Sequence, residues 1–326
     1  MHFMIGHLVE RSRASLTIQK RTYDDGMAYL IYSGMVPYDF VYSLGGIDMD
    51  QPITDRVVVV TGAGSGFGQL ISVKCAALGA KVVRADITQN GLEQTLGMIK
   101  EAGGDAICQP TDVTLLADVQ KLANRAIEVF GAIDVMVNNA GTMPLAFYRD
   151  HATAMDSWSR CIDVNVKGVL HGIAAVHDQM IEQGRGHVVN LSSIYGNFPV
   201  EGAAVYGASK AAVNFLSDSL RVEAQGKIKV TIVRPTGVPA TGLAETVINR
   251  EATIGITGQK TESVQAKYAE ILSGQAPAEA LNKNDIRYFG LDPDSLTDQV
   301  VYAINQPWGV SISEITVRAS GEAYIL

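Results

Sequence analysis

The chain has 326 residues, of which 47% are hydrophobic and 18% charged. This length suits one large α/β domain or two small ones, and the apolar fraction argues against disorder. The net charge of -8 argues against a nucleic-acid partner, because such surfaces need an excess of Lys and Arg. No apolar run is long enough to span a membrane, so no membrane partner is expected.

The cysteines and histidines give no support for a metal site or a disulfide framework. Cys75, Cys108 and Cys161 are odd in number, lie far apart and form no CxxC pair. The six histidines include no HExxH pattern. We therefore expect reduced thiols in a cytoplasmic protein and no bound metal.

Residues 1–50 differ from the rest of the chain. Residues 1–23 are basic, whereas residues 24–50 hold five aspartates and no basic residue. Without a clear apolar core, a secretory signal is not expected. An organelle-targeting segment remains an alternative. We favour an N-terminal extension of unknown role, or an upstream start before a natural core that begins near Met49.

From residue 55 onward, short apolar runs alternate with runs of helical spacing. Strands are predicted at 56–62, 81–87, 105–113, 132–141, 186–192, 227–235 and 313–319. Helices are predicted at 68–80, 90–104, 115–131, 153–183, 204–225 and 294–305. This alternation predicts βαβ units and a doubly wound parallel sheet with helices on both faces, in one domain over 51–326.

Residues 236–292 break this regular pattern. They are rich in Thr, Gly and Gln and hold only helix-like pieces such as 261–272. A segment of this length is usually functional or mobile. We therefore predict an insertion that acts as a lid over the substrate.

A glycine-rich loop follows the first regular strand. In "TGAGSGFG", Thr61 leads, and Gly62, Gly66 and Gly68 lie between the strand and a helix. Glycines there allow a sharp turn and a close approach to a pyrophosphate, while the helix N-terminus offers free N–H groups. The alternative is a purely structural turn.

Asp86 ends the second strand, a little over 20 residues after Gly62. A carboxylate at that place can bond both hydroxyls of an adenosine ribose and would repel a 2′-phosphate. No basic residue stands at Ser65, or at Ile87 and Thr88. The pattern favours NAD over NADP, unless Asp86 is merely a solvated acid at a strand end.

Tyr206 and Lys210 lie four residues apart in "YGASK", so on a helix they share a face. Bringing a phenol from pKa 10 to near 7 takes about 4 kcal/mol. An ammonium about 4.5 Å away supplies roughly 3.5 kcal/mol at an effective dielectric near 20. The spacing predicts that Lys210 lowers the pKa of Tyr206. A surface pair on an alanine-rich helix is the alternative.

The glycine loop, the NNAG of residues 138–141 and the YGASK of residues 206–210, in this order, resemble the short-chain dehydrogenase/reductase family in its compact single-domain branch. The resemblance covers about residues 52–320 and implies a Rossmann-type fold. It implies that Tyr206 is the general acid/base and that Lys210 binds the nicotinamide ribose. Ser193 would hold the substrate oxygen, and Asn165 would anchor a water in a proton relay.

The resemblance and the loop pattern together give candidate contacts. The cofactor positions are Gly62, Ser65, Gly66, Phe67, Gly68, Asp86, Asp112, Val113, Asn139, Ala140, Gly141, Tyr206, Lys210, Pro235 and Val238. The substrate positions are Ser193, Tyr206, Met143 and Tyr195. The mostly apolar and aromatic substrate positions favour a medium-sized or apolar substrate.

Two positions depart from the family pattern. Thr236 replaces the glycine that usually follows Pro235, and Thr241 comes one residue late. The family pattern therefore does not define the backbone path beside the nicotinamide in this chain. The N-terminal extension also has no counterpart in the family.

The predicted function is hydride transfer between a secondary alcohol or ketone and NAD. The alternatives are an NADPH-dependent carbonyl reductase, a non-catalytic NAD-binding sensor or scaffold, and a lyase or epimerase that uses the same cofactor. The long helices over 153–183 and 204–225 should have faces to bury. In this family such helices pair between subunits, so we expect a homodimer or homotetramer.

Overall fold

The computed structural model describes residues 17–22, 28–33, 40–43, 53–101, 103–238 and 242–324. The chain divides into two compact units, Met1–Asp50 and Gln51–Leu326. In the first unit, β1 (Thr17–Thr22), β2 (Ala28–Ser33) and β3 (Phe40–Ser43) form an antiparallel sheet in that order. The rest of the predicted N-terminal extension lies outside the described residues.

The second unit is built on a seven-stranded, all-parallel sheet with the order β10–β9–β8–β7–β4–β5–β6. The strands are β4 (Val57–Thr61), β5 (Lys81–Asp86), β6 (Asp105–Pro110), β7 (Val135–Asn138), β8 (Gly186–Leu191), β9 (Ile228–Pro235) and β10 (Glu314–Val317). Each lies inside its predicted range. The order reverses between β4 and β7, where open α/β sheets bind ligands at the carboxyl ends of their strands.

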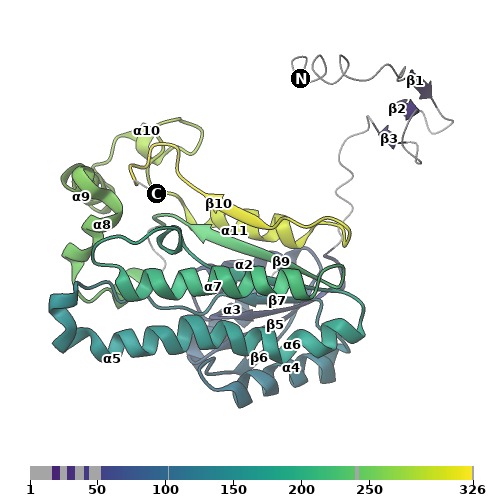
Figure 1. The fold of residues 1–326 in the computed structure, drawn as a ribbon, viewed down its shortest axis with the longest axis horizontal. Helices are drawn as coiled ribbons and strands as arrows, with labels where there is room; N and C mark the ends of the chain where they lie inside the picture. The colour runs from purple at the N-terminus through teal and green to yellow at the C-terminus, as the bar shows by residue number, and fades with distance from the viewer. Residues whose placement is uncertain are drawn as a thin grey trace. The chain divides into compact units, whose positions relative to one another are not determined.

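Helices cover both faces of this sheet (Figure 1). One layer holds α2 (Gly66–Ala77), α3 (Gln89–Glu101) and α11 (Pro293–Ile304), whose Ile71, Leu92 and Val300 share one buried core. The other layer holds α4 (Leu116–Phe130), α6 (Gly168–Glu182) and α7 (Ala204–Glu223), whose Leu122, Val176 and Leu220 share a second core. The predicted doubly wound fold is confirmed.

The helix predicted over 153–183 is not continuous. It consists of α5 (His151–Ile162), a π-helical turn over Asp163–Lys167 and α6. A 3-10 turn, Tyr148–Asp150, leads into α5. Single π-turns inside α-helices occur often at functional sites. This one carries Asn165, which is fully buried.

The described part of the segment predicted as a lid contains three 3-10 turns, two four-residue helices and one longer helix. They are η4 (Leu243–Thr246), η5 (Arg250–Thr253), α8 (Ile254–Thr257), η6 (Gly258–Lys260), α9 (Thr261–Leu272) and α10 (Ala278–Leu281). Thr241 lies outside the described residues. None of the helices in the described ranges is long and apolar enough to cross a membrane.

Candidate active site

The glycine loop turns from β4 into α2. Gly62 and Gly66 have φ values of +63° and +52°, which side-chain-bearing residues rarely adopt. A Cβ on Gly68 would overlap the carbonyl oxygen of Gly62. Ser65 is the exposed N-cap of α2, makes no side-chain cap bond and is followed by no acidic residue in the first turn. The N–H groups of this turn can therefore receive a phosphate.

Asn139 fastens the loop to the end of β7. Its Nδ2 donates to the carbonyl oxygens of Thr61 (2.9 Å) and Gly62 (3.1 Å). The Thr61 hydroxyl accepts the backbone N–H groups of Asn139 (3.0 Å) and Ala140 (3.2 Å). The Asn139 side chain thus supports the glycine loop. Because the Asn139 side chain is used in this way, backbone groups of 139–141 would make the predicted cofactor contact.

Asp86 lies at the carboxyl end of β5, beside the glycine loop. Its Oδ2 accepts the N–H of Gly64 at 3.0 Å, and its Oδ1 accepts the N–H and hydroxyl of Thr88 at 2.9 and 2.6 Å. An ionised carboxylate has about four acceptor positions, so one remains for a ligand hydroxyl. Arg84, by contrast, is fully buried and donates to Leu92 O at 2.6 Å, away from the surface of the loop.

Asp112 and Val113, two of the predicted cofactor positions, differ in their surroundings. The Asp112 carboxylate accepts the N–H and hydroxyl of Thr114 at 2.9 and 2.7 Å. Burial opposes ionisation there, but the Thr114 hydrogen bonds outweigh it and hold the pKa of Asp112 below its ordinary value. Val113 packs closely against Gly168 of α6, so its side chain belongs to the core.

The four predicted catalytic residues come together from three parts of the fold. Tyr206 and Lys210 lie on α7, Ser193 follows β8, and Asn165 lies in the π-turn. All are buried, with exposures of 3%, 5%, 6% and 0% respectively. Lys210 Nζ donates to the carbonyl oxygen of Leu191 at 2.7 Å and lies 5.8 Å from the ring centre of Tyr206.

The Asn165 side chain holds the loop that follows NNAG. Its Oδ1 accepts the N–H of Thr142 at 2.9 Å, and its Nδ2 donates to Thr142 O at 2.9 Å and to Ser209 Oγ at 3.0 Å. Ser209 donates in turn to the carbonyl oxygen of Tyr206 at 2.7 Å. Ser209, inside the YGASK motif, therefore links Asn165 to α7, a contact that the sequence reasoning missed.

Burial is the largest influence on the pKa values of Tyr206 and Lys210. It raises the pKa of Tyr206, and the hydrogen bond with Ser193 that favours the phenolate only partly offsets this. Burial lowers the pKa of Lys210 to about 8. The predicted lowering of the Tyr206 pKa by Lys210 is wrong for the chain's own groups. Desolvation of the phenol is the larger effect, and the ammonium is bonded to a backbone carbonyl.

The predicted substrate residues Tyr195 and Met143 lie close to Tyr206. The rings of Tyr195 and Tyr206 meet edge to face, with centres 5.4 Å apart. Met143 packs in the same cluster, and its N–H donates to Thr246 Oγ1 at 2.8 Å. That bond ties the lid segment to the loop after β7.

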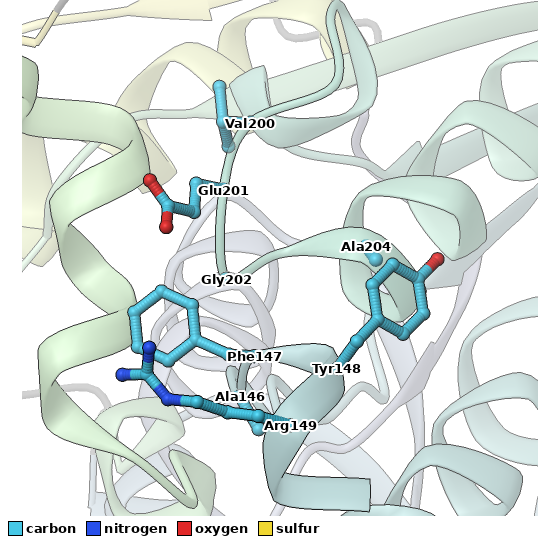
Figure 2. A pocket seen from close by; sticks show the side chains of 8 residues that line it. All are labelled: Ala146, Phe147, Tyr148, Arg149, Val200, Glu201, Gly202 and Ala204. Carbon is cyan, nitrogen blue, oxygen red and sulfur yellow. The ribbon is translucent and has the colours of Figure 1, made fainter.

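A pocket of about 320 Å³ lies at the starts of α5 and α7 (Figure 2). Its lining consists of Ala146, Phe147, Tyr148, Arg149, Val200, Glu201, Gly202 and Ala204. Figure 2 shows the Arg149 side chain close to the ring of Phe147, and the guanidinium carbon lies 4.2 Å from the ring centre. None of the predicted catalytic or substrate residues lines this pocket. No cluster of potential metal ligands occurs among the residues that the structure describes.

Comparison with known proteins agrees with this architecture. A family model described as short chain dehydrogenase matches residues 56–252. An uncharacterized oxidoreductase of Listeria innocua is 35% identical over 268 residues, which cover 81% of this chain and 96% of that protein.

Two solved structures illustrate the similarity in three dimensions. A short chain dehydrogenase/reductase from Burkholderia phymatum, in complex with NAD, is 28% identical with a TM-score of 0.64, and the match covers 81% of this chain and 89% of that one. A variant of the actinorhodin polyketide ketoreductase, with NADPH, is 28% identical with a TM-score of 0.65, covering 82% and 97%. The two similar structures hold different nicotinamide cofactors.

Proposed function

Because the chain belongs to the short chain dehydrogenase family, we propose that it transfers a hydride between a secondary alcohol or ketone and a nicotinamide cofactor. The observation that carries the proposal is the convergence of Tyr206, Lys210 and Ser193 beside a glycine loop. All lie at the carboxyl ends of parallel strands, where this architecture binds ligands.

The residues present fit a dinucleotide. The turn leaves no room for a Cβ at Gly62, Gly64 or Gly68, and it leads into the open N-terminus of α2. When bound, an oxidised nicotinamide would supply the hydride acceptor and a positive charge. On the nicotinamide side, the proposed contacts are Pro235 at the end of β9, Val238 shortly after it, and the backbone of 139–141.

We propose NAD as the cofactor. Asp86 presents a carboxylate with one acceptor position left beside the glycine loop. The nearest arginine in sequence, Arg84, is fully buried under α3 and donates to Leu92. A 2′-phosphate would therefore meet the negative charge of Asp86, and Arg84 would not neutralise it.

In this proposal Tyr206 exchanges a proton with the substrate oxygen, and Ser193 donates a hydrogen bond to that oxygen. Lys210, with a pKa of about 8, is mostly protonated at neutral pH. A Cβ on Gly141 would lie 3.7 Å from its Nζ, so the ammonium is next to the proposed cofactor loop. The raised pKa of Tyr206 means that proton transfer needs added positive charge at the site.

We also propose a homodimer or homotetramer. On α7, Ala208, Ala211, Phe215 and Val222 form an exposed apolar stripe, with Phe215 and Val222 about three-quarters exposed. The substrate is proposed to be medium-sized or apolar, because Met143 and Tyr195 flank Tyr206. The three free cysteines fit a reducing compartment such as the cytoplasm.

The cofactor assignment is tested by fluorescence titration of the wild type and Asp86→Ala with NADH and with NADPH. We expect the wild type to bind NADH more tightly and Asp86→Ala to lose that preference. Equal or tighter NADPH binding by the wild type would make the NADPH-dependent reductase the better proposal. Failure of both cofactors to bind would contradict the proposed function.

A further inference from the structure

Thr236, which departs from the family pattern, contacts the C-terminal segment. Its hydroxyl lies 2.6 Å from Glu322 Oε2 and 3.2 Å from the carbonyl oxygen of Val317. The Glu322 side chain is only 4% exposed, and its other oxygen accepts from Arg318 Nε at 2.6 Å. A buried carboxylate needs such partners, so the threonine hydroxyl is one of the bonds that keep Glu322 in place.

Tyr324 extends this contact to α9. A Cβ on Gly237 would overlap the Tyr324 hydroxyl, so this phenol fills the space that the glycine leaves open. The same hydroxyl lies 2.6 Å from that of Tyr268 on α9. Within the described residues, the C-terminal segment thus joins the loop after β9 to α9, two parts separated by more than twenty residues. Figure 1 shows the end of the chain near α9 and α10.

The joined parts both border the proposed active site. Pro235 ends β9 and Val238 follows it in the loop, and both are proposed contacts on the nicotinamide side. Tyr195 packs its ring on that of Tyr206, and it lies near enough to Tyr268 of α9 for an ionised Tyr268 to raise its pKa. Tyr206 itself is only 3% exposed, so a substrate must displace whatever covers it.

We propose that residues 318–324 form a C-terminal clasp that positions Thr236–Val238, directly after β9, and attaches α9 to them. Its two attachment points are the Thr236–Glu322 and the Tyr268–Tyr324 hydrogen bonds. The clasp transmits cofactor binding at Thr236–Val238 to α9. The coupling to cofactor rests on the proposed function, whereas the attachment of α9 does not.

The test is hydrogen–deuterium exchange of the α9 amides, with and without NADH. Variants are Tyr324→Phe, Thr236→Val, which keeps the size but removes the hydroxyl, and Thr236→Ser, which retains it. Tyr302→Phe is the control, because Tyr302 is 42% exposed on α11. Loss of one ordinary hydrogen bond corresponds to about five-fold faster exchange, which we expect for Tyr324→Phe but not for Tyr302→Phe.

With NADH bound, we expect slower α9 exchange in the wild type and in Thr236→Ser, and no slowing in Thr236→Val. Equal α9 exchange in the wild type and Tyr324→Phe would overturn the clasp. NADH slowing in Thr236→Val equal to that in the wild type would overturn the coupling. If NADH does not bind the wild type, the proposed function fails, while the comparison without NADH still decides whether the clasp holds α9.

Discussion

Replacing Lys210 with methionine should abolish activity and yet stabilise the fold at neutral pH. Lys210 is 5% exposed, and burial lowers its pKa from 10.5 to about 8. At about 1.4 kcal/mol per unit, keeping the ammonium charged at pH 7 costs about 3 kcal/mol. Methionine removes this cost and loses the bond to Leu191 O, worth about 1 kcal/mol. The net expectation is about 2 kcal/mol of added stability.

The pH dependence of the free energy of unfolding tests the sign of this predicted stability difference. Because the folded pKa lies below the unfolded one, the unfolded chain binds more protons between about pH 8 and pH 10.5. The wild type should therefore gain stability through that window, and Lys210→Met should not gain this increment. The advantage of the variant should shrink to near zero by pH 10.

Urea unfolding at pH 7 and pH 10 measures both effects. Lys100→Met, at an exposed position near the end of α3, is the matched control and should differ little from the wild type. A Lys210→Met variant that is less stable than the wild type by the same amount at both pH values would refute the reasoning. The ammonium would then be better solvated than its burial implies.

Three further outcomes are expected. Gly68→Ala should weaken NADH binding at least ten-fold in a fluorescence titration, because its Cβ would overlap the carbonyl of Gly62; wild-type affinity would contradict the close approach. Asn165→Ala removes the two hydrogen bonds between the Asn165 side chain and the backbone of Thr142 and should lower stability by about 2 kcal/mol in urea unfolding. An unchanged unfolding midpoint would show that these bonds do not hold the loop after β7. Phe215→Glu, at a 75% exposed position on α7, should reduce the mass seen by light scattering, and a monomeric wild type would contradict the proposed interface.

The regular part of the fold could be predicted because local signals agree with it. The central strands β4, β7 and β8 are short, largely apolar runs followed by Gly or a polar residue, and this composition follows from burial on both faces. The π-turn at 163–167 could not be predicted, because one extra residue inside a helix barely changes the hydrophobic spacing. Its effect is nevertheless to place Asn165 against Thr142.

The sequence predicts which residues form the candidate site, but it does not predict their pKa values or their tertiary contacts. The motifs give Tyr206, Lys210 and Ser193 directly, since they are local patterns. The pKa direction of Tyr206 depends on burial by residues distant in sequence, which the spacing to Lys210 does not contain. The partner of Thr236 likewise comes from Glu322, 86 residues later. Contacts of this kind are set by tertiary packing alone.

The proposed role of Tyr206 is tested most directly by comparing the wild type with Tyr206→Phe. The assay follows NADH absorbance with NAD and a panel of secondary alcohols, and NADH with the matching ketones. We expect the wild type to turn over at least one pair and Tyr206→Phe, which loses only the hydroxyl, to be about 100-fold slower or worse while it still binds NADH. Equal turnover by Tyr206→Phe would contradict the assignment. A wild type that binds NADH but turns over no alcohol or ketone would favour a sensor or scaffold.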